Sequence, residues 1–204
     1  MVHKSRPQLP RQTGGFSILE IVVVLAIIAV LAGILTPFVA SLIEDARVAR
    51  AARDAQSIAE AIQNLNKNTG KWPIFVSGAS ITTSSTYYEV LISPGNLPTA
   101  DTNWLPTPTS KRGSLSSILE LNTPAYTTSG QFAWRGPYIA TLQSDPWGNA
   151  YIVNSKSLRF GTREAGFVIS AGIDGAISTT FTQNIGSGQP AVTISGDDIA
   201  ARIR

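Results

Sequence analysis

The stretch Gly14-Gly15-Phe16-Ser17-Ile18-Leu19-Glu20 decides the fold, because it opens an apolar run that continues to residue 43. A short leader precedes it and carries three basic residues: Lys4, Arg6 and Arg11. In an ordinary secretory signal the cleavage site follows the apolar region, which is then discarded. Here the small-residue junction comes first, so cleavage after Gly15 would keep the apolar segment as the first element of the mature chain.

The apolar run is long enough to cross a membrane. Residues 21–35 contain no polar side chain. At ~1.5 Å per residue, ~20 such residues span the ~30 Å hydrocarbon core of a bilayer. We therefore expect residues 16–43 to form a single-pass transmembrane helix. The basic leader would hold its N-terminal end in the cytoplasm, which leaves the rest of the chain outside.

The order of leader, junction and helix resembles the class III leader of the type IV pilin family. The resemblance implies that residues 1–15 form a leader peptide, which a prepilin peptidase cleaves between Gly15 and Phe16. It also implies N-methylation of Phe16 and assembly of the mature chain into a filament through its N-terminal helix. Glu20 would be the fifth residue of the mature chain.

Glu20 and Pro37 are the two unusual residues of this helix. A carboxylate near the start of a membrane helix costs on the order of a few kcal/mol unless it is paired or lies at the interface. Glu20 therefore either lies at headgroup depth or pairs with the free amine of Phe16 on a neighbouring subunit, which would set the register of a filament. Pro37 removes a backbone donor and should kink or loosen the helix. In pilin-like families a proline here is associated with a bent or melted segment.

The charge balance argues against a nucleic-acid binder. The chain has 16 basic and 13 acidic residues. Removing the three basic leader residues leaves thirteen of each sign, so the mature side chains are formally neutral. The basic pI then belongs to the precursor, and a broad phosphate-binding surface is not expected.

The residue inventory also narrows the chemistry. The mature chain would contain no histidine, cysteine or methionine, because His3 and Met1 lie in the leader. This excludes Ser-His-Asp and Cys-His catalysis, ordinary zinc sites and disulfides. No paired-acid constellation can be located, so we predict that the protein is not an enzyme.

Beyond residue 43 the pattern becomes amphipathic. Apolar residues recur at helical spacing over residues 44–69, namely Ala55, Ile58, Ala59, Ile62 and Leu65. Gly70 and Pro73 provide a stop signal. One helix of about fifty residues would span ~80 Å. The alternative is a transmembrane helix and a separate amphipathic helix divided at Pro37.

The soluble domain, residues 44–204, ends in a predicted β region. Residues 73–130 are rich in turn-forming residues and predict an extended, irregular αβ loop with a short strand at 87–92 and a short helix at 114–121, capped by Ser114. Residues 131–204 predict four short strands, at 150–153, 158–160, 167–169 and 191–194. The predicted class is α+β: a long N-terminal helix packed on a small antiparallel sheet, which is the pilin-like fold.

Four motifs in this region resemble the major pseudopilin of type II secretion systems. They are Gly136-Pro137-Tyr138, Asp145-Pro146-Trp147-Gly148-Asn149, Ser170-Ala171-Gly172-Ile173-Asp174-Gly175 and Asp197-Asp198-Ile199. By residue type alone, the second motif is a tight turn in which Asp145 or Asn149 bonds backbone amides and Trp147 is a large anchor.

The same resemblance implies a bound calcium ion. In the resembled family calcium ties the C-terminal loop to the sheet, and the matching ligands here would be Asp174 with Asp197 or Asp198. Calcium prefers oxygen ligands, so the lack of histidine and cysteine does not oppose it. The segment between Asp174 and Asp197 is longer than the family loop, and an ordinary solvated turn at Asp174-Gly175 is the competing interpretation.

The resemblance predicts a structural function. The chain would wait in the bacterial inner membrane with its C-terminal domain in the periplasm, and then form a homo-oligomeric pseudopilus that drives protein export. Its partners would be minor pseudopilins, the prepilin peptidase and the inner-membrane assembly platform. Two alternatives stay open: a type IV surface pilus for adhesion, motility or DNA uptake, and a membrane-anchored binding module that never polymerises and presents residues 76–130 to a ligand.

Overall fold

The computed structural model describes residues 15–75, 87–185 and 192–204. Leader residues 1–14, residues 76–86 of the predicted αβ loop and residue 191 of the last predicted strand therefore lie outside the described residues. The chain divides into two compact units, Met1–Glu44 and Asp45–Arg204, and each is considered by itself.

Helix α1 runs without interruption from Ile18 to Thr69 and contains Pro37. A single helix therefore forms, and the alternative of two helices divided at Pro37 is wrong for this structure. The part of α1 in the first unit is long and apolar enough to cross a membrane, with a mean hydropathy of 3.1 over its most apolar window. It fits a single-pass membrane anchor.

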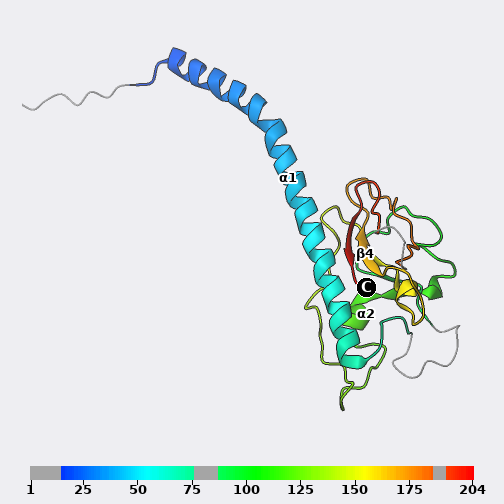
Figure 1. The fold of residues 1–204 in the computed structure, drawn as a ribbon. Helices are drawn as coiled ribbons and strands as arrows, with labels where there is room; N and C mark the ends of the chain where they lie inside the picture. Colours follow the sequence, from blue (N-terminus) through cyan, green and yellow to red (C-terminus); the bar gives the residue numbers. More distant parts are fainter. Residues whose placement is uncertain (1–14, 76–86, 186–191) are drawn as a thin grey trace, which may run out of the picture. The chain divides into compact units, whose positions relative to one another are not determined.

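The second unit contains a five-stranded mixed sheet (Figure 1). Its strands are β1 (Val90–Ile92), β2 (Arg112–Ser114), β3 (Ile152–Val153), β4 (Phe167–Ser170) and β5 (Ile199–Arg202). The spatial order is β2-β1-β3-β4-β5. The β1–β2 pair is parallel and the other three pairs are antiparallel. The predicted class and the helix-on-sheet architecture are confirmed, with one parallel pair in place of a wholly antiparallel sheet.

Both faces of the sheet are covered. One face packs against the stripe of α1 that carries Ile58, Ile62 and Leu65, all at most 2% exposed. The other face packs in a second cluster with Trp104 and Phe181. Successive strand residues point to opposite faces. Because neither face meets water, β3 and β4 are apolar at nearly every position instead of alternating with polar residues.

The predicted αβ loop contains part of this sheet. The strand predicted at 87–92 forms as β1, and the helix predicted at 114–121 forms as α2 (Leu115–Leu119). Ser114 caps α2, because its Oγ accepts a hydrogen bond from the Ser117 amide at 3.3 Å. Residues 73–130 thus contribute β1, β2 and α2, together with the 3-10 turn η1 (Thr109–Lys111), rather than an irregular connection alone.

Two predicted strands are wrong. Residues 158–160 do not form a strand, because the chain makes the 3-10 turn η2 (Ser155–Leu158) and then reverses through Gly161, whose φ is +86°. Residues 192–194 also lie outside any strand. The edge strand at this side of the sheet is β5. Its Ala200 and Ala201 have low β-propensity, and the strand forms through pairing with β4 along its length.

Ile62 provides a test of the helix–sheet contact. It is fully buried, and Ile62→Ala should lower the free energy of unfolding by about 2–5 kcal/mol through lost burial and a residual cavity. Denaturant unfolding of the full chain in detergent measures this. The matched control is Asn64→Ala on the exposed face of α1, which should change stability by less than about 0.5 kcal/mol. Equal effects of the two substitutions would contradict the assigned packing.

Candidate functional site

The residues predicted to act in assembly lie together at the start of α1. Phe16, Glu20 and Val24 line one hollow along the helix, with Ile21 and Leu25. Phe16 is 79% exposed and Glu20 is also exposed. Phe16 precedes the first residue of α1 by two positions, and its side chain lines the same hollow as Glu20.

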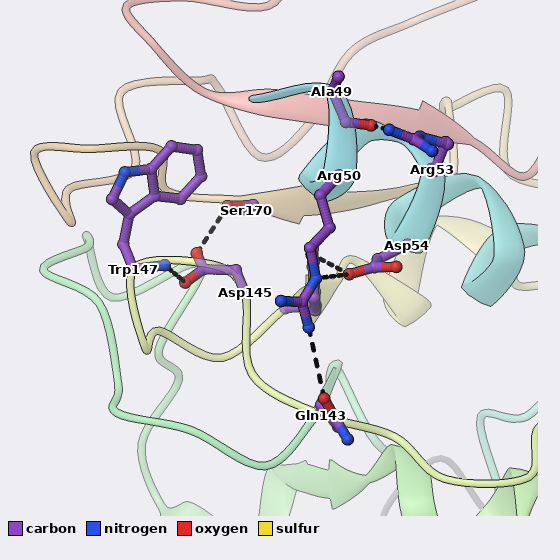
Figure 2. A network of polar contacts seen from close by, with 9 residues as sticks. Ala49, Arg50, Arg53, Asp54, Gln143, Asp145, Trp147 and Ser170 are labelled. Atoms are coloured by element: carbon purple, nitrogen blue, oxygen red, sulfur yellow. Dashed lines mark hydrogen bonds and ion pairs between the residues drawn. The ribbon is translucent and has the colours of Figure 1, made fainter. Parts of the chain in front are cut away.

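The Asp145 turn is the centre of the C-terminal motifs (Figure 2). Asp145 is 3% exposed. Its Oδ1 accepts hydrogen bonds from the amides of Trp147 at 3.0 Å and Asn149 at 2.7 Å. The Gly148 amide closes the turn by donating to the Asp145 carbonyl at 3.0 Å. The predicted turn is confirmed, with Asp145 rather than Asn149 as the residue that bonds the amides.

A hydrogen bond joins two of the motifs. The hydroxyl of Ser170, at the end of β4, donates to Asp145 Oδ2 at 2.7 Å (Figure 2). Asp145 therefore fixes both its own turn and the strand that leads into the Asp174 loop. Sequence reasoning named the Ser170 motif but did not assign Ser170 this role, because the two residues are 25 positions apart and nothing local relates them.

The Gly136-Pro137-Tyr138 motif ties the preceding loop to the end of α1. The Tyr138 hydroxyl oxygen accepts hydrogen bonds from Asn68 Nδ2 at 3.2 Å and from the Arg135 amide at 3.1 Å. A Cβ at Gly136 would lie 2.5 Å from the Trp134 ring, so only glycine allows this close approach.

Trp147, predicted to be a large anchor of the turn, is partly buried. The tryptophan that fills the core is Trp104, which is 1% exposed and packs edge-on against Phe167 and Phe181. Its indole N–H donates to the Thr179 carbonyl at 2.8 Å.

The structure brings the three candidate calcium ligands into one region. Asp197 Oδ2 accepts a hydrogen bond from the Asp174 amide at 3.1 Å. Gly172, with φ +65°, passes so close to Asp197 that a Cβ there would lie 2.4 Å from its carbonyl oxygen. Asp174 Oδ1 accepts from the Ala176 amide at 2.7 Å, which is the hydrogen bond of an ordinary Asx turn. Both interpretations of Asp174 thus have a geometric basis.

The two carboxylate oxygens of Asp198 differ in their hydrogen bonding. Its Oδ2 accepts hydrogen bonds from the amides of Ser178 at 2.9 Å and Thr179 at 2.7 Å. Its Oδ1 is buried and has no hydrogen-bond partner among the residues that the structure describes. Burial raises the pKa of Asp198, and the neighbouring charge of Asp197 raises it further, while the Thr179 and Ser178 hydrogen bonds oppose the shift.

Side chains alone do not complete a metal site here. Within residues 15–75, 87–185 and 192–204, no group of three or more His, Cys, Asp or Glu residues is placed to hold a metal ion. A calcium ion accepts backbone carbonyls and water as further ligands, so the aspartates fit calcium only with such oxygens.

A small hollow of about 140 Å³ lies beside α1 in the second unit, lined in part by Arg50, Asp54 and Tyr151. Arg50 Nε lies 3.4 Å from Asp54 Oδ2, and Arg50 Nη2 donates to Gln143 at 3.4 Å (Figure 2). Burial, then the charge of Asp54, raises the pKa of Tyr151, so its hydroxyl stays protonated at neutral pH. The Tyr151 hydroxyl is therefore not an activated nucleophile.

Comparison with protein families gives two matches. Residues 10–36 match the prokaryotic N-terminal methylation motif, and residues 107–187 match type II secretion system protein G. Together they are the matches of a type IV pilin-like pseudopilin. Comparison with curated proteins and with solved structures found no match.

The two matched ranges contain different predicted site residues. The first contains Gly15, Phe16 and Glu20, which supports the resemblance of the leader. The second contains Asp145, Ser170 and Asp174 but ends before Asp197 and Asp198. Members of these families are structural subunits, so the protein is not an enzyme.

Asp145→Ala tests the central turn. It leaves two backbone amides and the Ser170 hydroxyl without their acceptor, and we expect the free energy of unfolding to fall by about 3 kcal/mol. Ser170→Ala removes one of these hydrogen bonds and should cost only about 1 kcal/mol. Denaturant unfolding compares them. A loss for Asp145→Ala no larger than for Ser170→Ala would show that the turn amides do not depend on the carboxylate.

Proposed function

We propose that this pseudopilin is a subunit of a type II secretion pseudopilus, polymerising through the first half of α1 to drive protein export. The observation that carries the proposal is the presence of a methylation motif and a protein G domain on one chain. They are joined by a helix whose apolar side chains are uncovered from Ile18 to Ile43 in the isolated chain.

The apolar side chains of this part of α1 must be shielded from water. Lipid would shield these side chains while the subunit lies in the membrane, and the helices of neighbouring subunits would shield them in a filament. The large apolar area involved suits an assembly held without covalent links. Inside such a bundle Glu20 would be costly until it met the free amine of Phe16 on a neighbour, and their pairing would set the subunit register.

Pro37 provides for a change in the helix during assembly. It has no N–H to donate to the carbonyl of Gly33, one turn earlier, and Gly33 itself is a weak helix former. The helix is continuous at Pro37 in the single chain. We propose that residues 33–37 bend or unwind when the subunit enters the filament.

The location and partners follow from the same proposal. The subunit would lie in the bacterial inner membrane with Asp45–Arg204 in the periplasm. A prepilin peptidase would cleave after Gly15 and methylate Phe16. Minor pseudopilins and the inner-membrane assembly platform would be the remaining partners, and no nucleic acid is expected because the mature chain is formally neutral.

We also propose a calcium ion held by Asp174, Asp197 and Asp198 with backbone oxygens. The buried and unpartnered Oδ1 of Asp198 supports this, because a cation would satisfy it. Bound calcium would neutralise part of the carboxylate charge and join the loop after β4 to the segment before β5. Asp174, Asp197 and the backbone at Gly172 already bring these two segments together.

Calcium should raise the melting temperature of the full chain in detergent, because a ligand that binds only the folded state stabilises it. At ~100 times its dissociation constant the gain is about 2.7 kcal/mol. Asp174→Ala should abolish the gain, whereas Glu60→Ala, an equal loss of charge on the exposed face of α1, should leave it unchanged. A melting temperature unaffected by calcium or its chelation would end this part of the proposal.

Glu20→Gln tests the export function. In a strain deleted for the gene, the wild-type chain should restore both pseudopilus formation and secretion, and Glu20→Gln should restore neither, although mass spectrometry should still find cleavage after Gly15. Glu60→Gln is the matched control and should behave as wild type. Loss of surface pili with normal secretion in the deletion strain would instead assign the chain to a surface pilus.

A further inference from the structure

Basic residues gather at one end of the sheet of the second unit, and aspartates gather at the other end. No Lys or Arg occurs between Arg163 and Arg202. Strand β4 runs between the ends: Phe167 is opposite Arg202, and Ser170 is opposite Ile199. We call the Phe167 side of the sheet the basic end and the Ser170 side the acidic end. The basic end contains Lys156, Arg159, Arg163, Arg202 and Arg204, with Lys111 and Arg112 at the start of β2. It also contains Glu164 and Glu89, which pairs with Lys111 at 2.7 Å and Lys156 at 3.8 Å, so seven basic residues outnumber two acidic ones. The acidic end contains Asp145, Asp174, Asp197 and Asp198, and Asp101 follows the β1 loop there.

The basic end presents a fully exposed aromatic residue on a well-held turn. Phe160 is 104% exposed, at the turn that follows η2. The Arg204 guanidinium donates to the carbonyls of Ser157 and Thr162 at 3.1 and 2.8 Å, which fixes both sides of this turn. Arg159 stacks over the Tyr87 ring at 4.3 Å. An exposed phenyl ring on a turn whose two sides are fixed by hydrogen bonds is typical of a contact surface.

The acidic end presents exposed apolar residues as well. Leu97 is 52% exposed and Ile173 is 59% exposed. The Thr99 amide donates to the Gly175 carbonyl at 2.9 Å, which joins the loops of Leu97 and Ile173. The Asn96 amide donates to the Gly148 carbonyl at 2.9 Å, which joins the Leu97 loop to the Asp145 turn. This end therefore combines a fixed apolar surface with excess negative charge, and it is the counterpart of the Phe160 surface in both respects.

We propose that the Phe160 surface is an interface for a second copy of this chain, with the acidic end of the neighbour as its occupant. The two surfaces of one subunit cannot contact each other, because they lie at opposite ends of β4. When the basic end of one subunit contacts the acidic end of another, the pair still has one free basic end and one free acidic end. Further subunits can add at both, so this contact propagates into a filament. Opposite charges would fix the direction of addition and oppose contact between like ends.

This inference rests on the proposed polymerisation and adds a contact between soluble domains to that between helices. It is compatible with the proposed calcium ion. The acidic end has five aspartates, so two positive charges from calcium leave a formal charge of minus three, and the complementarity to the basic end persists.

Cysteine crosslinking tests the contact cleanly, because the chain contains no cysteine. Phe160→Cys combined with Leu97→Cys should give a ladder of disulfide-linked oligomers in membranes that contain filaments, whereas either single variant should give dimers at most. A disulfide within one subunit is not expected, because residues 160 and 97 lie toward opposite ends of β4. The four residues of β4 span ~10 Å, and a disulfide requires Cα atoms within ~7 Å.

Two controls separate this contact from general proximity. Phe160→Cys with Phe132→Cys, a residue of similar exposure (58%) that contacts the end of α1, should give no ladder. In the crosslinking background Arg163→Glu should lower the ladder yield about fivefold, the size expected when an exposed attraction becomes a repulsion. Lys67→Glu, the same charge reversal on α1, should leave the yield unchanged.

The outcome is read against filament formation by electron microscopy, with melting temperatures to confirm that each variant folds. A ladder specific to residues 160 and 97 supports the contact. Normal filaments and secretion without such a ladder would overturn this inference and leave the proposed pseudopilus function standing. Wild-type protein that stays monomeric and forms no filaments would contradict both this inference and the proposed pseudopilus function.

Discussion

Burial of one stripe of α1 against the sheet is the contact on which the second unit depends. Ile58, Ile62 and Leu65 cover one face of strands that are two to four residues long. Strands this short have too few ladder hydrogen bonds to hold a sheet in water without packing. The helix therefore supplies much of the hydrophobic surface that makes the sheet stable, and the second cluster around Trp104 closes the opposite face.

Polar side chains fix the loops that join these short strands. Asp145 holds the turn before β3 and the end of β4. Asn154, fully buried, donates to the carbonyls of Ala165 and Phe181 and accepts from the Phe167 amide. The side chains of Asp145 and Asn154 hydrogen-bond backbone groups that have no partner in a strand, because the chain is irregular at these places. Buried polar groups whose hydrogen bonds are made in this way are compatible with the core.

The first unit obeys a different constraint, because its apolar surface has no partner within the chain. Side chains from Ile18 to Ile43 stay uncovered while the stripe of the same helix beyond Asp45 is buried. One continuous helix thus carries two kinds of hydrophobic surface: one that stabilises the fold and one that is left for lipid or for other subunits. The families matched by residues 10–36 and 107–187 correspond to these two parts of the chain.

The sequence by itself determined the features that depend on local pattern. The apolar run, the amphipathic stripe from Ala55 to Leu65, the Ser114 cap and the Asp145 turn all follow from residues close in sequence, and all formed as predicted. Tertiary structure alone decided the rest. Phe160 looked like a strand residue but lies exposed, because η2 and Gly161 turn the chain away from the sheet. Residues 199–202 became the edge strand through pairing with β4, and Ser170 found Asp145 across 25 positions. These outcomes depend on contacts between distant segments, which compete with local propensity and override it where burial is greater.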